Sequence, residues 1–276
     1  MIAVLLLAAL SLPAISDVPA GAPVNRAGFR YARPLGVVPR GLVSLTLDAD
    51  ALSRSRALND VRIVDAKSNQ VPYLVVPLQA PVLMKMAIPR PTREGKQSVY
   101  RFTLPYDTLP NGAELELTTS AGVFERDILF RRPLDESRGR ESEIIGRSAW
   151  QSAPSLRMNV ASGRTIEVVV DEGDNAPLPI TAAQLRLLGY ALRFVSPGTA
   201  LTLLYGNPSI AAPRYDLALE SAHLIGQPAR TIVLKGAAPV EQPARGGELR
   251  FFGAAIAVAV VVLLITLARL VSAKSS

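Results

Sequence analysis

The chain has 276 residues, a formal net charge of +7 and a pI of about 10.0. It contains no cysteine, which excludes a disulfide framework, a thiolate metal site and a cysteine nucleophile. Its single histidine excludes a metal centre built from several histidines. With 22 prolines against 19 glycines, the composition favours short strands separated by turns over long helices. We therefore expect an all-β fold of two β-sandwich domains, and no cofactor.

The first 20 residues have the pattern of an export signal. An apolar run from Ile2 to Leu12 is followed by a proline and by small residues that fit cleavage before Asp17 or Gly21. A transmembrane span is the alternative, but this run is too short to cross a hydrocarbon core of about 30 Å. The sequence therefore predicts a signal peptide over residues 1–20.

Residues 251–268 form the longest apolar stretch, in which only Thr266 has a polar side chain. At a rise of about 1.5 Å per residue, a helix of this length nearly spans the hydrocarbon core. A buried helix of a globular domain is the alternative, but such helices are rarely apolar on every face. Because Arg250 precedes the stretch and Arg269 follows it, we expect a single transmembrane helix.

The two apolar ends together predict the topology of the chain. Export at the front and a membrane helix at the back place the residues between them outside the cytoplasm. Residues 269–276 then form a short cytoplasmic tail. Residues 237–250 are rich in Pro, Ala and Gly, and we expect them to form a tether that holds the domains off the bilayer.

The first predicted domain covers residues 21–90. Within it, residues 42–48 alternate apolar and polar side chains, which predicts a half-buried strand. Residues 50–58 predict one or two helical turns, capped by Asp48 or Asp50.

Residues 61–65 and 70–76 are two β-rich runs joined by a short polar turn, which predicts a hairpin. Pro72 lacks an amide donor, so we expect it at an edge or a bulge. Residues 77–96 are rich in Pro, Lys and Arg, and we expect them to connect the two domains, although residues 82–88 could form a strand.

The second predicted domain covers residues 91–236. Its apolar and polar side chains alternate in short runs separated by turns, which is typical of a sandwich or a jelly roll. The alternating runs are residues 100–104, 114–117, 156–160 and 165–170, and further candidate strands are residues 184–188, 191–194, 201–205 and 231–235. Residues 131–143 interleave Arg with Asp and Glu, which indicates a solvated loop. No basic helix with interleaved aromatic residues occurs, so nucleic acid is not an expected partner.

Four segments resemble a bacterial envelope family known as domain of unknown function 3999. They are LNDVRIVDAKSNQVPYLV at 58–75, YRFTLP at 100–105, DEGDNAPLPI at 171–180 and YGNPSIAAPRYDLA at 205–218. The resemblance implies β-rich domains in the periplasm, a C-terminal helix in the inner membrane and a polytopic membrane protein as partner. It implies no catalytic residues. The strand order, with Trp150 before a strand, is also similar to galactose-binding-like jelly rolls.

Two polar features are candidates for chemistry. His223 is the only ordinary general base near neutral pH, but no G-x-S-x-G motif supplies a nucleophile, so a boundary histidine is the better interpretation. In the segment 171–175, Asp171, Asp174 and Asn175 could share a hard cation such as Ca²⁺. A polar turn whose side chains bond local amides is the alternative, and we favour it.

Exposed aromatic rings are the feature that a sugar-binding protein needs. The candidates are Tyr73, Tyr106, Trp150, Tyr190 and Tyr205, of which we single out Trp150, Tyr190 and Tyr205. Aromatic residues in strands more often belong to the core. The sequence therefore predicts a non-enzymatic, single-pass envelope protein that acts by binding or scaffolding. A glycan-binding module is the alternative, and a hydrolase built around His223 is a further one.

Overall fold

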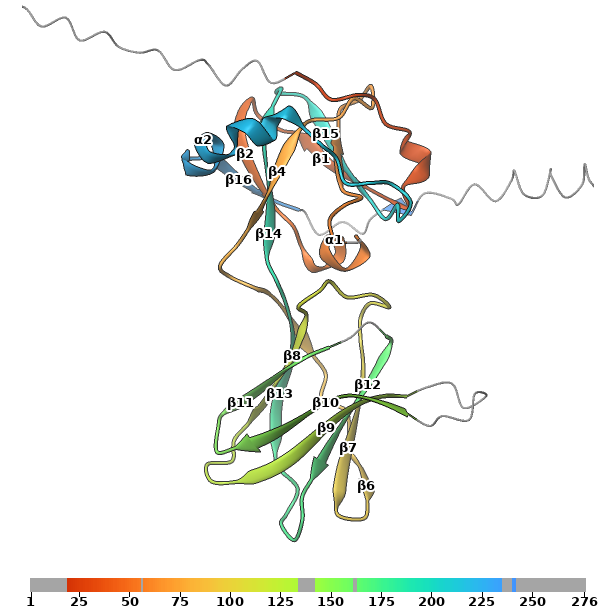
Figure 1. Cartoon of the computed structure of the whole chain (residues 1–276), viewed down its shortest axis with the longest axis vertical. Helices are drawn as coiled ribbons and strands as arrows, with labels where there is room; N and C mark the ends of the chain where they lie inside the picture. Colours follow the sequence, from red (N-terminus) through yellow and green to blue (C-terminus); the bar gives the residue numbers. More distant parts are fainter. Residues whose placement is uncertain (1–18, 56, 134–141, 161–162, 235–239, 242–276) are drawn as a thin grey trace, which may run out of the picture.

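The computed structural model describes residues 19–55, 57–133, 142–160, 163–234 and 240–241. The predicted membrane helix and almost all of the predicted signal peptide and tether lie outside these residues. None of the helices within them is both long and apolar enough to cross a bilayer. The described chain is mostly β-strand, arranged in four sheets, which confirms the expected all-β class. Figure 1 shows two lobes, each built around two of these sheets.

We call the lobe that carries both ends of the described chain the terminal lobe. Its strands are β1 (Tyr31–Val37), β2 (Gly41–Thr46), β3 (Arg62–Val64), β4 (Tyr73–Pro77), β14 (Tyr190–Ser196), β15 (Ala200–Tyr205), β16 (Arg230–Val233) and β17 (Val240–Glu241). They form one sheet of order β17-β1-β15-β3 and another of order β16-β2-β14-β4. Its short helices are η2 (Arg26–Gly28), α1 (Ala49–Arg54), η4 (Asp216–Glu220) and α2 (Ser221–Gly226).

The other lobe, which we call the inserted lobe, lies between β4 and β14 in the sequence. Its strands are β5 (Val82–Met86), β6 (Thr92–Glu94), β7 (Gln97–Thr103), β8 (Glu114–Thr119), β9 (Glu125–Pro133), β10 (Ser142–Gln151), β11 (Ser155–Asn159), β12 (Thr165–Asp171) and β13 (Ile180–Leu187). They form a five-stranded sheet of order β10-β9-β12-β7-β6 and a four-stranded sheet of order β11-β8-β13-β5.

The chain crosses between the lobes twice, after β4 and before β14, and the two crossings run side by side. Tyr190 pairs with Pro77 at the terminal-lobe end. In the crossing itself, the Leu78 amide donates to the Gly189 carbonyl at 2.9 Å. A Cβ on Gly189 would lie 2.4 Å from the carbonyl oxygen of Ala80, so this close approach requires glycine.

This topology differs from the expected division into residues 21–90 and 91–236. Strands β14, β15 and β16 were predicted to belong to the second domain, but they pair with β1, β2, β3 and β4 of the terminal lobe. The predicted connection over residues 77–96 instead contains β5 and β6 of the inserted lobe. The reason is physical: alternation along a strand shows which face is buried, but it does not show which distant strand completes the sheet.

The predicted hairpin of residues 61–65 and 70–76 is also wrong. Strand β3 pairs with β15, whereas β4 pairs with β14 in the opposite sheet. Among the described residues, the two runs are joined by an isolated bridge between Val64 and Gln70 and by bonds from the Val71 amide to the Ile63 carbonyl and from the Tyr73 hydroxyl to the Val61 carbonyl, but not by a ladder of paired strands. The short polar turn therefore carries the chain from one sheet to the other, and Pro72 lies in that crossing.

Several local predictions are confirmed. Strand β2 buries Val43 and Leu45, and α1 begins after Asp48, whose carboxylate accepts a hydrogen bond from the Ala51 amide at 3.0 Å. Strands β9 and β10 were not predicted. They occupy part of the expected loop 131–143, and the rest of that loop lies outside the described residues. Their charged and small residues interrupt the alternation on which the strand predictions depend.

One apolar core runs through both lobes. It contains Leu45, Phe194 and Leu203 of the terminal lobe, together with Phe102 and Phe130 of the inserted lobe. The inserted lobe is therefore packed against the terminal lobe, and the junction between them is a place where a site can be formed from both.

Candidate functional site

Two of the three aromatic residues singled out from the sequence are buried. Trp150 is 1% exposed, its indole Nε1 donates to the Ala153 carbonyl at 2.8 Å, and its ring packs edge-on against Phe124. Tyr205 is 0% exposed, and its hydroxyl donates to Asp50 at 2.7 Å. Neither ring is available to stack on a sugar. Tyr190 is half-buried, so it remains as a candidate.

The segment 171–175 has the contacts of a polar turn. The Asp171 carboxylate accepts a hydrogen bond from the Gly173 amide at 3.0 Å. Asp174 forms an exposed ion pair with Lys96, and the Asn175 side chain donates to the Glu172 carbonyl. Within the described ranges, no group of three or more His, Asp or Glu side chains is placed to hold a metal ion.

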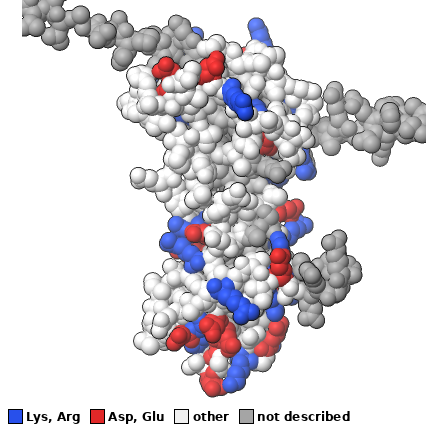
Figure 2. All heavy atoms as spheres, in the orientation of Figure 1, with Lys and Arg blue, Asp and Glu red and all other residues white. Residues whose placement is uncertain are grey.

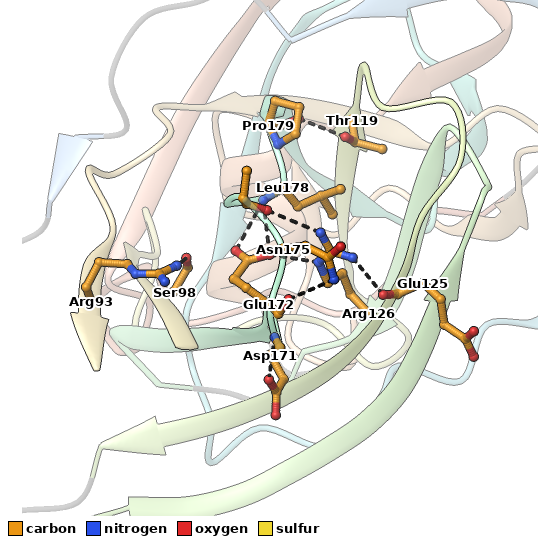
Figure 3. A network of polar contacts seen from close by, with 12 residues as sticks. Arg93, Ser98, Thr119, Glu125, Arg126, Asp171, Glu172, Asn175, Leu178 and Pro179 are labelled. Carbon is orange, nitrogen blue, oxygen red and sulfur yellow. Dashed lines mark hydrogen bonds and ion pairs between the residues drawn. The ribbon is translucent and has the colours of Figure 1, made fainter. Parts of the chain in front are cut away.

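The residue between these candidates, Glu172, belongs to a buried network (Figure 3). Its carboxylate pairs with Arg126 Nε at 2.8 Å and accepts from the Leu178 amide. Arg126 also donates to the carbonyls of Glu125 and Ala176. Both charges have their partners within the inserted lobe, and the network holds the turn after β12 against β9.

His223 lies exposed on α2, where its ring contacts the side-chain amide of Gln227. This position is that of the boundary histidine favoured by the sequence analysis. Tyr190, unlike His223, lies at the junction of the lobes.

A cavity of about 610 Å³ opens at this junction, and we call it the junction cavity. Its lining includes the buried Leu52 and Leu74 and the three tyrosines 73, 190 and 215. Pro110 and Asn111, from the loop between β7 and β8, complete the lining from the inserted lobe. Its volume lies in the range of about 300–1,000 Å³ that is usual for small-ligand sites.

Two of the tyrosines present rings to the cavity while their hydroxyls are engaged. The Tyr73 hydroxyl donates to the Val61 carbonyl at 2.5 Å, and the Tyr215 hydroxyl donates to the Gln70 side chain at 2.8 Å. The two rings meet edge-on, with centroids 5.3 Å apart. Burial raises the pKa of Tyr73, and burial raises the pKa of Tyr215 to about 12 despite the opposing charge of Arg62. Both side chains are therefore neutral near pH 7 and act as aromatic surface.

Asp60 holds the turn at residues 57–59, which forms one wall of the junction cavity. It is 2% exposed, and its carboxylate accepts from the amides of Gly206 and Asn207 at 2.7 and 2.8 Å and from the Ser55 hydroxyl. Gly206 has a φ of +84°, and a Cβ there would lie 2.5 Å from the Tyr31 ring. The positive φ and the lack of room for a Cβ each require glycine after β15.

Arg62 fixes the segment that contains residues 212–215, which forms a second wall of the junction cavity. It is 3% exposed and donates to the carbonyls of Asn59 at 2.8 Å and Ala211 at 2.6 Å. Asp60 and Arg62 thus join two segments that are far apart in the sequence, 58–75 and 205–218. These are two of the four segments quoted for the family resemblance.

The backbone beside the cavity is strained. Ala57 and Leu58 line it, and both have positive φ angles, of 51° and 62°. A left-handed conformation costs a residue with a Cβ roughly 1–2 kcal/mol. Such a conformation persists only where the surrounding structure enforces it, and it is common beside ligand sites. Here Asp60 provides that enforcement through Ser55.

Four polar side chains in the lining have no partner among the described residues. Asn59, Asn111, Tyr190 and Arg214 form neither a side-chain hydrogen bond nor an ion pair there. The junction cavity therefore combines an aromatic surface with uncommitted donors and acceptors, which is the usual composition of a ligand site.

The sequence analysis named Tyr73 and Tyr190 but missed Asn59, Asn111, Arg214 and Tyr215. All four missed residues lie outside strands, where no alternation marks them. The only signals were two family-like segments: 58–75, which contains Asn59, and 205–218, in which Arg214 and Tyr215 follow Ala-Ala-Pro without any strand pattern.

Other hollows lie outside the junction cavity. One of about 540 Å³ in the terminal lobe is lined by Arg40, Asp65 and Gln227, among others, and its described lining contains no aromatic ring. A groove of about 410 Å³ in the inserted lobe is lined by Met84, Met86 and Phe102, with a single aromatic ring. Figure 2 shows acidic and basic side chains interspersed over the face of the inserted lobe that it presents. On this face the basic excess of the chain is not gathered into a surface of one sign.

Comparisons with known proteins add no assignment: no family model, no curated protein and no solved structure matches the chain.

Proposed function

We propose that the chain is a non-enzymatic, single-pass protein of the bacterial envelope that binds a saccharide in the junction cavity. Residues 1–20 direct export, residues 251–268 anchor the chain in the inner membrane, and both lobes stand in the periplasm. The junction cavity carries the binding function, because it combines tyrosine rings with polar side chains that are not used within the described structure.

The chemistry of the lining favours a saccharide over an acyl chain. The apolar faces of sugar rings pack on aromatic rings such as Tyr190 and Tyr215. Side-chain amides such as those of Asn59 and Asn111 each supply two donors and one acceptor for hydroxyl groups. An acyl chain in this cavity would make no use of these exposed amides and would leave the half-buried Tyr190 hydroxyl without a partner, at a cost of about 1–3 kcal/mol.

The strand order of the inserted lobe gives a weaker support. Without β6, its two sheets have the order of an eight-stranded jelly roll, as in the galactose-binding-like folds that the sequence resembles. This is an analogy at the level of fold, and the cavity lies at the edge of that lobe. A polytopic membrane-protein partner, implied by the family resemblance, is compatible with the same topology.

Thermal melting of the full-length protein in detergent tests the proposal. The probes are chitotetraose, maltotetraose and the tetramers of galacturonate and mannuronate. A ligand at 100 times its Kd stabilises the folded state by about 2.7 kcal/mol. We expect at least one probe to raise the Tm of the wild-type protein.

The site is tested with two substitutions of exposed alanines. Ala212→Trp places a bulky ring in the lining of the junction cavity, whereas Ala66→Trp changes a turn away from it. The shift in Tm should disappear with Ala212→Trp and remain with Ala66→Trp. If no probe shifts the Tm, or if both variants respond like the wild type, the proposed function is wrong.

Protease added to spheroplasts tests the location. Both lobes should be digested from outside, with the membrane helix spared. Protection of the whole chain would contradict a periplasmic position.

A further inference from the structure

We infer that the junction cavity selects saccharides that carry a carboxylate, and that Arg214 is the residue that recognises this group. The inference rests on the proposed binding function and deepens it by naming the class of ligand.

Charge in the lining is the first observation. Among the described residues that line the cavity, Arg214 is the only one with a charged side chain. It is exposed and forms no ion pair within the described structure. The nearby buried acid, Asp60, is committed to the amides of Gly206 and Asn207. Arg214 is therefore the one charged side chain in the described lining, and no acid of that lining pairs with it.

The chemistry of the guanidinium group is the second step. An arginine presents several N–H donors in a planar fork, which matches the two oxygens of a carboxylate. A neutral hydroxyl can accept only one such bond and brings no charge. An uncommitted arginine in a ligand cavity therefore favours an anionic substituent over a hydroxyl.

The aromatic walls define where that substituent must be. A sugar ring that stacks on Tyr190 or Tyr215 keeps its face apolar, so its charge must lie at the edge of the ring. A uronic acid has this geometry, because its carboxylate is attached to a ring carbon and lies at the periphery. Stacking and an ion pair with Arg214 can then occur in the same complex.

The two asparagines add a constraint on length. Asn59 belongs to the terminal lobe and Asn111 to the inserted lobe, so their side chains approach the cavity from different lobes. A ligand that contacts both, as well as Arg214, must extend across the junction. An oligosaccharide of several units meets this requirement better than a single sugar.

The test compares ligands that differ only in charge. Tetragalacturonate and tetramannuronate are each titrated into the full-length protein in detergent, beside their fully methyl-esterified forms. Esterification keeps the ring and hydroxyl pattern and removes the negative charge. We expect at least one acid to bind about tenfold or more tightly than its ester, since a charge-assisted bidentate pair is lost.

Two variants locate the effect. Arg214→Gln should weaken binding of the acid about tenfold and binding of the ester, which can accept only one neutral hydrogen bond, by about threefold or less. Arg147→Gln is the matched control: Arg147 is also exposed and lies in β10, away from the cavity. Because it removes the same charge, it measures the general electrostatic effect, and it should leave the affinity for the acid within about twofold.

The outcomes separate this inference from the proposed function. If neutral saccharides or esters bind as tightly as the acids, and Arg214→Gln has no effect, the inference is wrong and saccharide binding stands. If Arg147→Gln weakens binding as much as Arg214→Gln, the attraction is a property of the whole surface and the inference is also wrong. If no saccharide binds the wild-type protein, both proposals are overturned.

Discussion

Two sets of buried charges, one in each lobe, are used in different ways. In the inserted lobe, Glu172 and Arg126 neutralise each other, and the network around them stays within one sandwich. In the terminal lobe, Asp60 and Arg62 bind backbone groups of the loop that follows β15. The first arrangement holds a sheet together, whereas the second holds irregular backbone in place beside a cavity.

This difference supports the proposal that the ligand binds in the junction cavity. A buried ion pair inside a regular sheet satisfies its own groups and leaves little for a ligand. A buried charge that enforces a strained turn, as Asp60 does for Ala57 and Leu58, maintains a shape that the local sequence would not adopt alone. Strain that is enforced in this way is expected at binding sites more often than in supporting sheets.

The largest expected effect comes from breaking the ion pair of the inserted lobe. Arg126→Met leaves the Glu172 carboxylate buried without its cationic partner, which should lower the free energy of unfolding by about 3–5 kcal/mol. Denaturant unfolding of the full-length protein in detergent, followed by circular dichroism, measures the change. The control is Arg101→Met, because Arg101 pairs with Glu167 from a side chain that is 70% exposed. It should cost about 1 kcal/mol or less, and equal losses would contradict the distinction.

The second effect breaks the clamp of the terminal lobe. Asp60→Ala removes the acceptor of two backbone amides and one hydroxyl, so we expect a loss of about 2–4 kcal/mol. Asp60→Asn keeps one acceptor oxygen and should cost less. Saccharide affinity distinguishes the two variants further. At temperatures where both are folded, Asp60→Asn should weaken saccharide binding, whereas Arg126→Met should not. Equal affinities for the two folded variants would mean that the clamp does not shape the site.

The third effect is the dependence of stability on pH. Burial alone would raise the pKa of Glu167, but hydrogen bonds from Arg101 and Arg131 outweigh it and lower the pKa below the ordinary value of 4.5. A carboxyl with a lowered pKa stabilises the fold above its ordinary pKa, and this contribution is lost as the pH falls through the folded value. Glu167→Gln should therefore flatten the loss of stability below pH 4.5, by roughly 1 kcal/mol. An unchanged acid limb in unfolding curves would refute this assignment.

The smallest effect concerns backbone strain. Ala57→Gly relieves a left-handed conformation that costs about 1 kcal/mol, but it also adds freedom to the unfolded chain. The net result should be a stabilisation of about 0.5 kcal/mol. Ala66→Gly, in another exposed turn but without a positive φ, should instead destabilise by a similar amount. Opposite signs in thermal melting would confirm the strain, and the same sign would contradict it.

The local structure could be predicted from the sequence where one short segment contains the whole cause. The alternation around Val43 and Leu45 specifies a half-buried strand, and Asp48 before an Ala-rich turn specifies a helix start. The partners of the strands could not be predicted in this way. Strand β14 pairs with β2, although the whole inserted lobe separates the two strands in the sequence. Nothing in the sequence around Tyr190 indicates that pairing.

The candidate site could be predicted only in part, for a related reason. An aromatic residue in a strand has the same pattern whether its ring fills the core, as Trp150 does, or lines a cavity, as Tyr190 does. Arg214 and Tyr215 lie in a loop, where periodicity gives no information. Their position in the cavity lining depends on the contacts that Asp60 and Arg62 make with that loop. These contacts join residues that are distant in the sequence.

The most direct test of the central claim is hydrogen exchange of the full-length protein with and without the acidic tetrasaccharide that binds most tightly. The account predicts slower exchange at the junction cavity, in residues 57–59, at Asn111 and in residues 214–218, with contributions from both lobes. The groove at residues 84–87 and 101–104 of the inserted lobe should be unchanged. Protection of that groove instead, or of neither region, would contradict the assignment of the junction cavity as the binding site.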